Sequence, residues 1–247
     1  MALLTTDALV LQSFPYGETS RIVRLLTRAA GVHTAIAKGA ARPRSRYHVL
    51  EPFAEGSAAL YIRPTRELQT LASFDVTRSR HELGRDLLRF GGASLLAELV
   101  LRTASEEAQP DLFDVIAQGL DHITCVDAAA LEVAVLAATW RAIAVLGFTP
   151  ELDVCIVCSR DIAARDDASF DYAAGGLRCV ACAAGLPGRR VPGRARNALR
   201  AFCRGEAVRV DITTGHWRLL ARYLEHHLLE GAQLRSLHFV ATSLSVR

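Results

Sequence analysis

Short runs that alternate between β-branched or apolar residues and smaller or polar ones recur at intervals of about ten residues near the start of the chain. Five such runs lie between Asp7 and Phe74: ALVLQSF, RIVRLLT, VHTAIAK, SAALYIR and LQTLASF. In the third, β-branched residues occupy every second position from Val32 to Ile36, the period of a strand. Five short strands favour a closed barrel, since closure removes exposed edges. We expect an OB-type barrel over residues 1–79.

After Thr77 the apolar residues change to a helical spacing. One face of a long helix is marked by Leu87, Leu88, Leu95, Leu96, Leu99 and Val100. Pro110 is expected to begin a second helix, and Asp127 to cap a third that runs to Gly147. Helical patterns return near residues 196–204 and 217–230. The predicted fold class is therefore α+β, with a helical domain over residues 80–247.

The most apolar stretch, Ala128 to Phe148, contains Glu132 and Arg141. It favours a core helix, because a membrane span needs about 20 uninterrupted apolar residues. The first residues, MALLTTDALVLQSF, have no basic leader and carry Asp7 inside the apolar run, which argues against a signal peptide. We expect a soluble cytoplasmic protein that does not bind a membrane.

Charge is segregated along the chain although the formal net charge is only +3. Residues 1–80 hold 11 Lys+Arg and 6 Asp+Glu, residues 81–150 hold 4 and 10, and residues 151–247 hold 14 and 10. The two ends are basic and the middle is acidic. A basic barrel attracts polyanions, whereas the acidic, Leu-rich middle is better suited to protein partners.

Four of the six cysteines form two Cys-x2-Cys pairs, Cys155 with Cys158 and Cys179 with Cys182. This spacing is typical of zinc ribbons, in which two turns supply four thiolates to one Zn²⁺. A closed shell of four thiolates leaves no position for substrate, so we predict one structural Zn²⁺ in a segment at about residues 152–185. Two disulfides or free thiols remain alternatives, of which disulfides are disfavoured without export. The isolated Cys125 and Cys203 are expected to be buried.

Motifs of the common enzyme classes are missing from the sequence. There is no G-x-x-x-x-G-K-[ST] phosphate loop, no G-x-S-x-G turn, no second histidine after His81-Glu82, and no H-x-E with P-C-x-x-C. A nuclease would need a carboxylate cluster for Mg²⁺, and the aspartates at 161, 166, 167 and 171 are better interpreted as a solvated loop. The protein is expected not to be an enzyme.

A basic loop between two predicted strands is the main nucleic-acid candidate. It contains Lys38, Arg42, Arg44 and Arg46, and Tyr47 follows directly. A cationic loop beside a barrel can follow phosphates, and an aromatic ring gives a base a stacking partner. Arg21, Arg24 and Arg28 are expected to extend this patch, although a solvated loop is the alternative interpretation.

A second arginine cluster follows the cysteines. Arg196, Arg200 and Arg204 are spaced by four and would form one stripe on a helix, which fits a DNA surface and an ordinary solvated face equally. The aromatic residues Phe14, Phe53 and Phe74 are expected in the barrel core.

The chain resembles the RecO family of bacterial recombination mediators over nearly its whole length. The resemblance rests on PYGETSR at residues 15–21, on Gly31, on AIAKGAARPRSR at residues 35–46, and on LEPF at residues 50–53. Around the basic loop the sequence departs from the family, which often has two basic residues where Ala41-Arg42 stands, so one phosphate contact is expected to be missing.

The resemblance implies an N-terminal OB-fold, a central helical domain and a zinc-binding C-terminal region. It also implies binding to single- and double-stranded DNA, annealing of complementary strands, and, with RecR, help in loading RecA on DNA coated by single-strand-binding protein. By the same resemblance, DNA contacts fall on Lys38, Arg42, Arg44 and Arg46, and metal binding on the four paired cysteines. The alternative function is a zinc-ribbon protein-interaction scaffold that does not anneal DNA.

Overall fold

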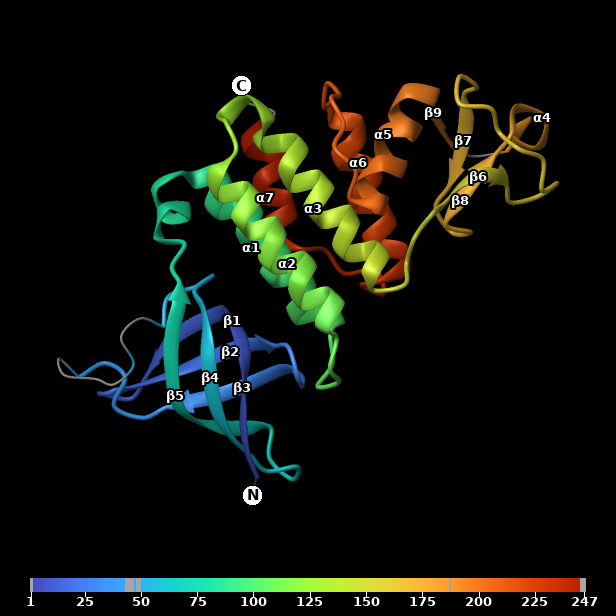
Figure 1. Cartoon of the computed structure of the whole chain (residues 1–247). Coiled ribbons are helices and arrows are strands. Elements are labelled where there is room, and N and C mark those ends of the chain that lie inside the picture. The colour runs from blue at the N-terminus through green and yellow to red at the C-terminus, as the bar shows by residue number, and fades with distance from the viewer. Residues whose placement is uncertain (1, 43–46, 48–49, 187, 245–247) are drawn as a thin grey trace. The chain divides into compact units, whose positions relative to one another are not determined.

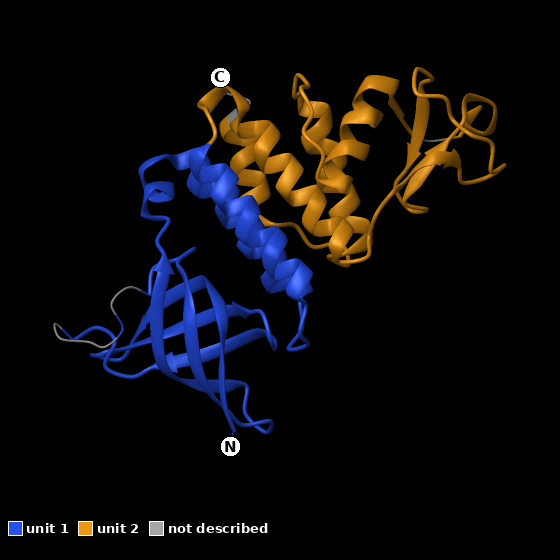
Figure 2. Cartoon of the chain, viewed as in Figure 1, with its two compact units in different colours: residues 1–125 blue, residues 126–247 orange. Residues whose placement is uncertain are grey.

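The chain is described from a computed structural model, which covers residues 2–42, 47, 50–186 and 188–244 (Figure 1). It divides into two compact units, residues 1–125 and 126–247, and each is described by itself (Figure 2). The first unit therefore contains the barrel together with the next two helices. The domain boundary expected at residue 79, between the barrel and the helical domain, remains a prediction.

The first unit begins with the five expected strands. They are β1 (Ala2–Tyr16), β2 (Ser20–Thr27), β3 (Gly31–Ala37), β4 (Glu55–Ile62) and β5 (Leu68–Arg78). They close into a barrel in the order β1-β2-β3-β5-β4, in which only β3 and β5 run parallel (Figure 1). The prediction of five strands in a closed barrel is confirmed.

Alternation along the strands decides which side chains fill the barrel. In β2, Val23 and Leu25 face inward and are fully buried, as are Ala35 and Ala37 of the paired strand β3. The residues between them, such as Thr34, are only partly buried on the outer face. This period of two is the one that the sequence predicted.

Two helices complete the first unit: α1 (Leu87–Thr103) and α2 (Pro110–Cys125), after the 3-10 helix η1 (His81–Arg85). Asp86 caps α1, because its side chain accepts hydrogen bonds from the N–H groups of Leu88 and Arg89. The loop between the helices packs on β3 at Gly31, which has a φ of 67°. A Cβ there would lie 2.3 Å from the carbonyl oxygen of Ser105, so only glycine allows this approach.

The second unit is mainly helical. It contains η2 (Ala128–Ala130), α3 (Leu131–Val145), α5 (Gly193–Arg204), α6 (Thr214–His227) and α7 (Arg235–Leu244). The prediction for Asp127 is wrong in detail: the residue precedes the 3-10 turn and its side chain makes no cap hydrogen bond. Helix α7 was not predicted, because Gly231 and Gln233 interrupt the apolar spacing before it.

The segment Ala128–Val145 is apolar and long enough to cross a membrane by length and composition. Leu136, Trp140 and Ile143 within it are nevertheless buried in the second unit, as expected for a core helix.

The cysteine segment forms a small sheet within the second unit. Its strands are β6 (Glu151–Cys155), β7 (Ala168–Asp171), β8 (Gly176–Arg178) and β9 (Arg189–Val191), in the order β6-β8-β7-β9, with the short helix α4 (Val180–Ala183) after β8. Strands β6 and β8 are parallel neighbours. Both therefore end on the same side of the sheet, which brings together the two turns that follow them.

Candidate metal centre and nucleic-acid interface

The two cysteine pairs meet where β6 and β8 end. The Sγ atoms of Cys155, Cys158, Cys179 and Cys182 all lie within 4.8 Å of one another. In the first turn, Ser159 adopts a φ of 56° and its N–H donates to the Cys155 carbonyl over 2.8 Å. In the second turn, the Ala183 N–H donates to the Cys179 carbonyl over 2.9 Å. Each turn thus directs two thiols toward one point.

Backbone amides around the cluster favour a thiolate. The N–H of Cys179 donates to Cys155 Sγ over 3.3 Å. Although burial acts to raise the pKa of Cys155, donation by the N–H groups of Cys179, Cys158 and Val157 brings that pKa down to about 6. Hydrogen bonding with Cys158 and Cys179, by contrast, raises the pKa of Cys182 to about 12. Four thiols this close cannot all ionise without a cation between them, which is the condition that a bound metal satisfies.

The donor set fits a metal ion. Four sulfur atoms at these separations suit a soft or borderline cation in tetrahedral geometry. The two other cysteines stand apart from the cluster. Cys203 is buried, as expected, and burial raises the pKa of its thiol to about 12. The expectation for Cys125 is wrong, because it is exposed at the last residue of α2.

The arginine stripe on α5 faces the cysteine segment. Arg196 is fully buried and its Nη2 donates to the Ala163 carbonyl over 2.5 Å. Arg200 forms an ion pair with Asp153 and donates to the Leu152 carbonyl over 3.3 Å. Burial accounts for most of the lowered pKa of Arg196. A DNA-contact role for Arg196 is thus contradicted by its lack of any exposed surface, and Arg200 is largely taken up by its internal contacts.

The described part of the basic loop is a tight turn after β3. Lys38 and Arg42 are exposed, and the Arg42 N–H donates to the Gly39 carbonyl over 3.1 Å. The Ala41 N–H donates to the Thr19 carbonyl over 2.9 Å, which joins this turn to the β1–β2 turn. Arg44 and Arg46 lie outside the described residues.

Two of the three arginines expected to extend the patch lie on β2. Arg21 is half-buried and its Nε donates to the hydroxyl of Ser13 over 2.8 Å. Arg24 is also half-buried and lies opposite Gln12 of β1 and Thr34 of β3. Its side chain therefore shares the outer face of the barrel with those residues.

The aromatic residues divide differently from the prediction. Tyr47 is buried in the barrel core and donates its hydroxyl to the Leu71 carbonyl over 2.7 Å, so a base-stacking role for it is contradicted. Phe53 and Phe74 are buried, as expected. Phe14 is 42% exposed, and its assignment to the core is wrong because the β-bulge between Val10 and Gln12 shifts the alternation of β1.

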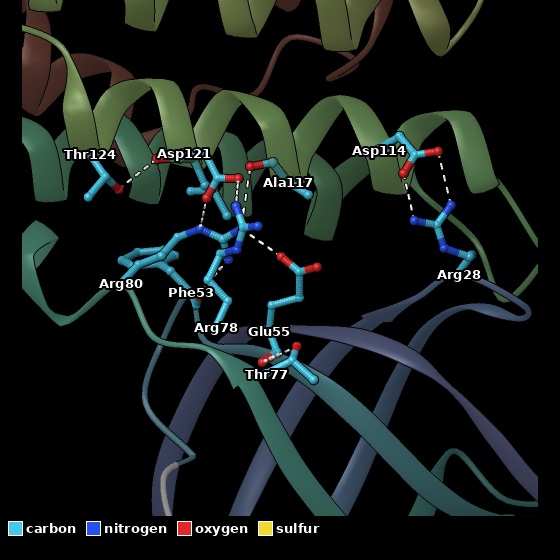
Figure 3. Close-up of polar contacts among 11 residues, drawn as sticks. Arg28, Phe53, Glu55, Thr77, Arg78, Arg80, Asp114, Ala117, Asp121 and Thr124 are labelled. Atoms are coloured by element: carbon cyan, nitrogen blue, oxygen red, sulfur yellow. Dashed lines mark hydrogen bonds and ion pairs between the residues drawn. The ribbon is translucent and has the colours of Figure 1, made fainter.

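Acidic residues of α2 neutralise arginines of the barrel (Figure 3). Arg28 donates to both carboxylate oxygens of Asp114, over 2.9 and 2.6 Å, and these bonds hold the pKa of Asp114 below its usual range. Arg78 and the buried Arg80 both bind Asp121. Part of the charge segregation along the sequence is therefore cancelled inside the first unit. Arg28, which the sequence placed near the DNA patch, is one of the arginines whose charge is neutralised, because it pairs with Asp114.

The acidic loop of the second unit does not gather into a metal site. Asp167 pairs with Arg190, and Asp171 with Arg178. Among the described residues, the cysteine cluster is the group arranged to hold a metal ion.

Comparisons with known proteins match both the barrel and the helical part of the chain to the same family. The model of the Recombination protein O N-terminal family matches residues 1–80, and that of the Recombination protein O C-terminal family matches residues 84–238. A DNA repair protein RecO from Anaeromyxobacter dehalogenans (strain 2CP-C) is 33% identical over 94% of this chain and 93% of its own length. That of Myxococcus xanthus is 32% identical over 95% and 96%.

A third relative, the DNA repair protein RecO of Heliobacterium modesticaldum, is 35% identical over 67% of this chain and 59% of its own length. The two family models meet within a few residues of Arg80, where the barrel ends and the helices begin. The chain belongs to the RecO family of DNA repair proteins.

Proposed function

We propose that this chain is a non-enzymatic recombination mediator, which binds single- and double-stranded DNA and anneals complementary strands. The observation that carries the proposal is the turn at residues 38–42, which presents two exposed cations beside the barrel. Among the described residues, no carboxylate lies within 4.0 Å of Lys38 or Arg42. Arg28 and Arg78 of the barrel, by contrast, have acidic partners, so this turn retains its charge for phosphates.

Annealing follows from charge neutralisation. Cations on the barrel reduce the repulsion between two DNA backbones, and pairing then proceeds by base complementarity. The protein contacts phosphates and reads no sequence. The closed barrel is proposed to be of the OB type, whose second and third strands and adjoining loops bind oligonucleotides in other proteins. Family membership supports this assignment to recombinational repair in the cytoplasm, at the nucleoid.

The proposed partners follow from the family. We propose that the chain acts with RecR to load RecA on DNA that is coated by single-strand-binding protein. The contacts with RecR and single-strand-binding protein are direct in this proposal, and that with RecA is indirect.

The metal is proposed to be one structural Zn²⁺ held by Cys155, Cys158, Cys179 and Cys182. Four thiols whose sulfur atoms lie within 4.8 Å of one another match the ligand set of a closed zinc site. Zinc content of protein purified under reducing, metal-replete conditions tests the assignment. About one equivalent is expected, the same content in a Cys203→Ala variant, and a loss in a Cys158→Ser variant. A content below about half an equivalent in the parent protein would contradict the assignment.

Strand annealing of labelled complementary oligonucleotides at several salt concentrations tests the main proposal. Replacing Lys38, Arg42 and Arg44 together by alanine should weaken binding to all sequences and flatten the salt dependence, by about 0.7 to 0.9 in logarithmic slope for each lost phosphate contact. A control with Arg85 and Arg209, both exposed, changed to alanine should retain wild-type binding. Unchanged affinity of the triple variant at low salt would refute the role of the turn.

One observation favours the alternative scaffold function. Val157 and Val180, within the two cysteine turns, are 61% and 72% exposed, and the nearby Leu186 is 52% exposed. Exposed apolar residues that lie close together on a folded segment are typical of protein contacts. The annealing assay separates the two functions, because a scaffold would neither anneal strands nor bind DNA in a salt-dependent way.

A further inference from the structure

The outer face of strands β1, β2 and β3 carries a group of exposed and half-buried side chains. Phe14 lies opposite Ile22, which lies opposite Ile36, and the neighbouring row contains Gln12, Arg24 and Thr34. The inner face of the same strands lines the barrel core, where Val23 and Ala35 are fully buried. Residues in the rows of Phe14 and Arg24, together with Tyr16, therefore point away from the core, and we call this surface the aromatic face.

Two aromatic rings are open to solvent on this face. Phe14 is 42% exposed and Tyr16 is 52% exposed. They are two residues apart on β1, so their side chains leave the same side of the strand about 7 Å apart. Successive bases of an extended single strand can occupy rings at such a separation, because stacking requires only a flat apolar surface.

Cations lie at one end of the aromatic face. Strand β1 ends at Tyr16, and the turn that follows is hydrogen-bonded to the turn of Lys38 and Arg42 through Thr19. Both cations are exposed. A strand stacked on Tyr16 would thus continue directly onto the basic turn.

A second pair of cations lies toward the other end. The Val32 N–H donates to the Ser105 carbonyl over 2.9 Å, which fixes the end of α1 beside β3. Arg102 is in the last turn of α1, three residues before Ser105. Arg24 of β2 lies opposite Thr34 of β3, and Thr34 is two residues after Val32. The two arginines therefore approach the same part of β3. Partial burial, and then the charge of Arg102, hold the pKa of Arg24 below its usual range.

The pair formed by Arg24 and Arg102 has no acidic partner. Among the residues that the structure describes, no carboxylate oxygen lies within 4.0 Å of either guanidinium group. Two neighbouring cations that repel each other are stabilised by an anion between them. Carboxylates near the face lie in the turns and loops beside it: Glu18 follows β1, Glu67 comes just before β5, and Glu106 in the loop after α1 has its Oε1 atom 3.9 Å from Nδ1 of His33.

We propose that the aromatic face is a binding site for single-stranded DNA, in which bases stack on Phe14 and Tyr16 while Arg24 and Arg102 hold a phosphate. The inference rests on the proposed DNA-binding function and adds to it a preference for unpaired strands. In duplex DNA the base faces are covered by neighbouring pairs, so a duplex uses the cations of this site but not its rings. The mediator would therefore hold strands with bases available for pairing.

Fluorescence anisotropy of the full chain tests the rings with three probes of equal length: oligothymidylate, a strand of abasic residues, and a duplex. The abasic strand keeps the phosphates and lacks the bases. A variant with Phe14→Ala and Tyr16→Ala should bind oligothymidylate about tenfold or more weakly. Its affinity for the abasic strand and for the duplex should equal that of the parent protein, and its salt dependence should not change.

Matched variants make the result specific. Tyr16→Phe keeps the ring and should retain the parent affinity for oligothymidylate. Because both rings are exposed, their removal deletes little core packing, and an unchanged thermal unfolding transition verifies that the variant is folded. Parent-like binding of oligothymidylate by the double variant would overturn the proposal. An equal loss on the abasic strand would also overturn it, since the rings would then act without bases.

The arginine pair has a different signature. Replacing Arg102 by alanine should lower the salt slope by about one for oligothymidylate and the abasic strand alike, with Arg85→Ala as the control. An unchanged slope would remove Arg102 from the site. If the parent chain bound no DNA, the proposed function itself would fail. If the variant of the basic turn lost affinity but the double aromatic variant did not, only the present inference would fail.

Discussion

Arg80 should be the side chain on which the packing of the barrel against α2 depends most. Its side chain is 1% exposed, and its Nε donates to Asp121 over 2.7 Å. Its Nη1 donates to the Phe53 carbonyl over 2.9 Å, and its Nη2 pairs with Glu55 over 2.6 Å. Figure 3 shows this guanidinium group between the barrel and the helix. One planar cation thus satisfies three acceptors, two beside the start of β4 and one on α2.

Replacement of Arg80 by methionine keeps most of the aliphatic stem of the side chain and removes every donor. The carboxylate of Glu55, 23% exposed, and the Phe53 carbonyl then lose their partner. Removing one member of a buried ion pair costs about 3–5 kcal/mol. Because Glu55 and Asp121 are partly reached by water, we expect the lower end, about 3 kcal/mol. An Arg80→Lys variant should recover only part of this lost stability, since one ammonium group cannot reach three acceptors as a guanidinium group does.

Arg78 provides the matched control, because it binds the same Asp121 but is 54% exposed. Arg78→Met should cost no more than about 1 kcal/mol. Native-state hydrogen exchange of the barrel amides measures the free energy of unfolding of the first unit. Tryptophan fluorescence reports on the second unit, because the two tryptophans, Trp140 and Trp217, both belong to it. Its unfolding therefore serves as an internal reference that neither variant should change. Costs for the two variants within about 0.5 kcal/mol of each other would refute the reasoning.

Two other outcomes are expected from the structure. Removal of the proposed Zn²⁺ by a chelator should raise amide hydrogen exchange in the cysteine segment and also at the start of α5, because Arg196 and Arg200 donate hydrogen bonds to that segment. Exchange changes that stop short of α5 would contradict this coupling. His33 is 4% exposed, and burial lowers its pKa, an effect that Glu106 and the Ala30 backbone oppose in part. The unfolded chain therefore binds a proton near pH 6.5 while the folded chain does not, so the free energy of unfolding of the first unit should fall as the pH drops through about 6.5 toward the folded pKa. Hydrogen exchange of the barrel amides at about pH 7.5 and 5.5 measures this change in the free energy of unfolding. A His33→Leu variant with the same pH dependence as the parent would exclude His33 as the source of that dependence.

Local spacing predicted a large part of this protein. Five strands followed from the period of two, α1 and α2 from helical spacing, and the meeting of the cysteine pairs from two Cys-x2-Cys turns. Each of these features depends on residues close together in the chain, or on a ligand set whose spacing is itself the signal.

Tertiary structure decided which side chains are available for contact. The spacing of Arg196 and Arg200 is the same whether their helix face meets water or the cysteine segment, and only packing showed that it meets the segment. A single β-bulge moved Phe14 outward, while Tyr47 turned into the core. Exposure depends on what distant segments place against a residue. Sequence therefore determined the elements and the chemistry of the chain, and the packing of remote segments selected which cations and rings can meet a ligand.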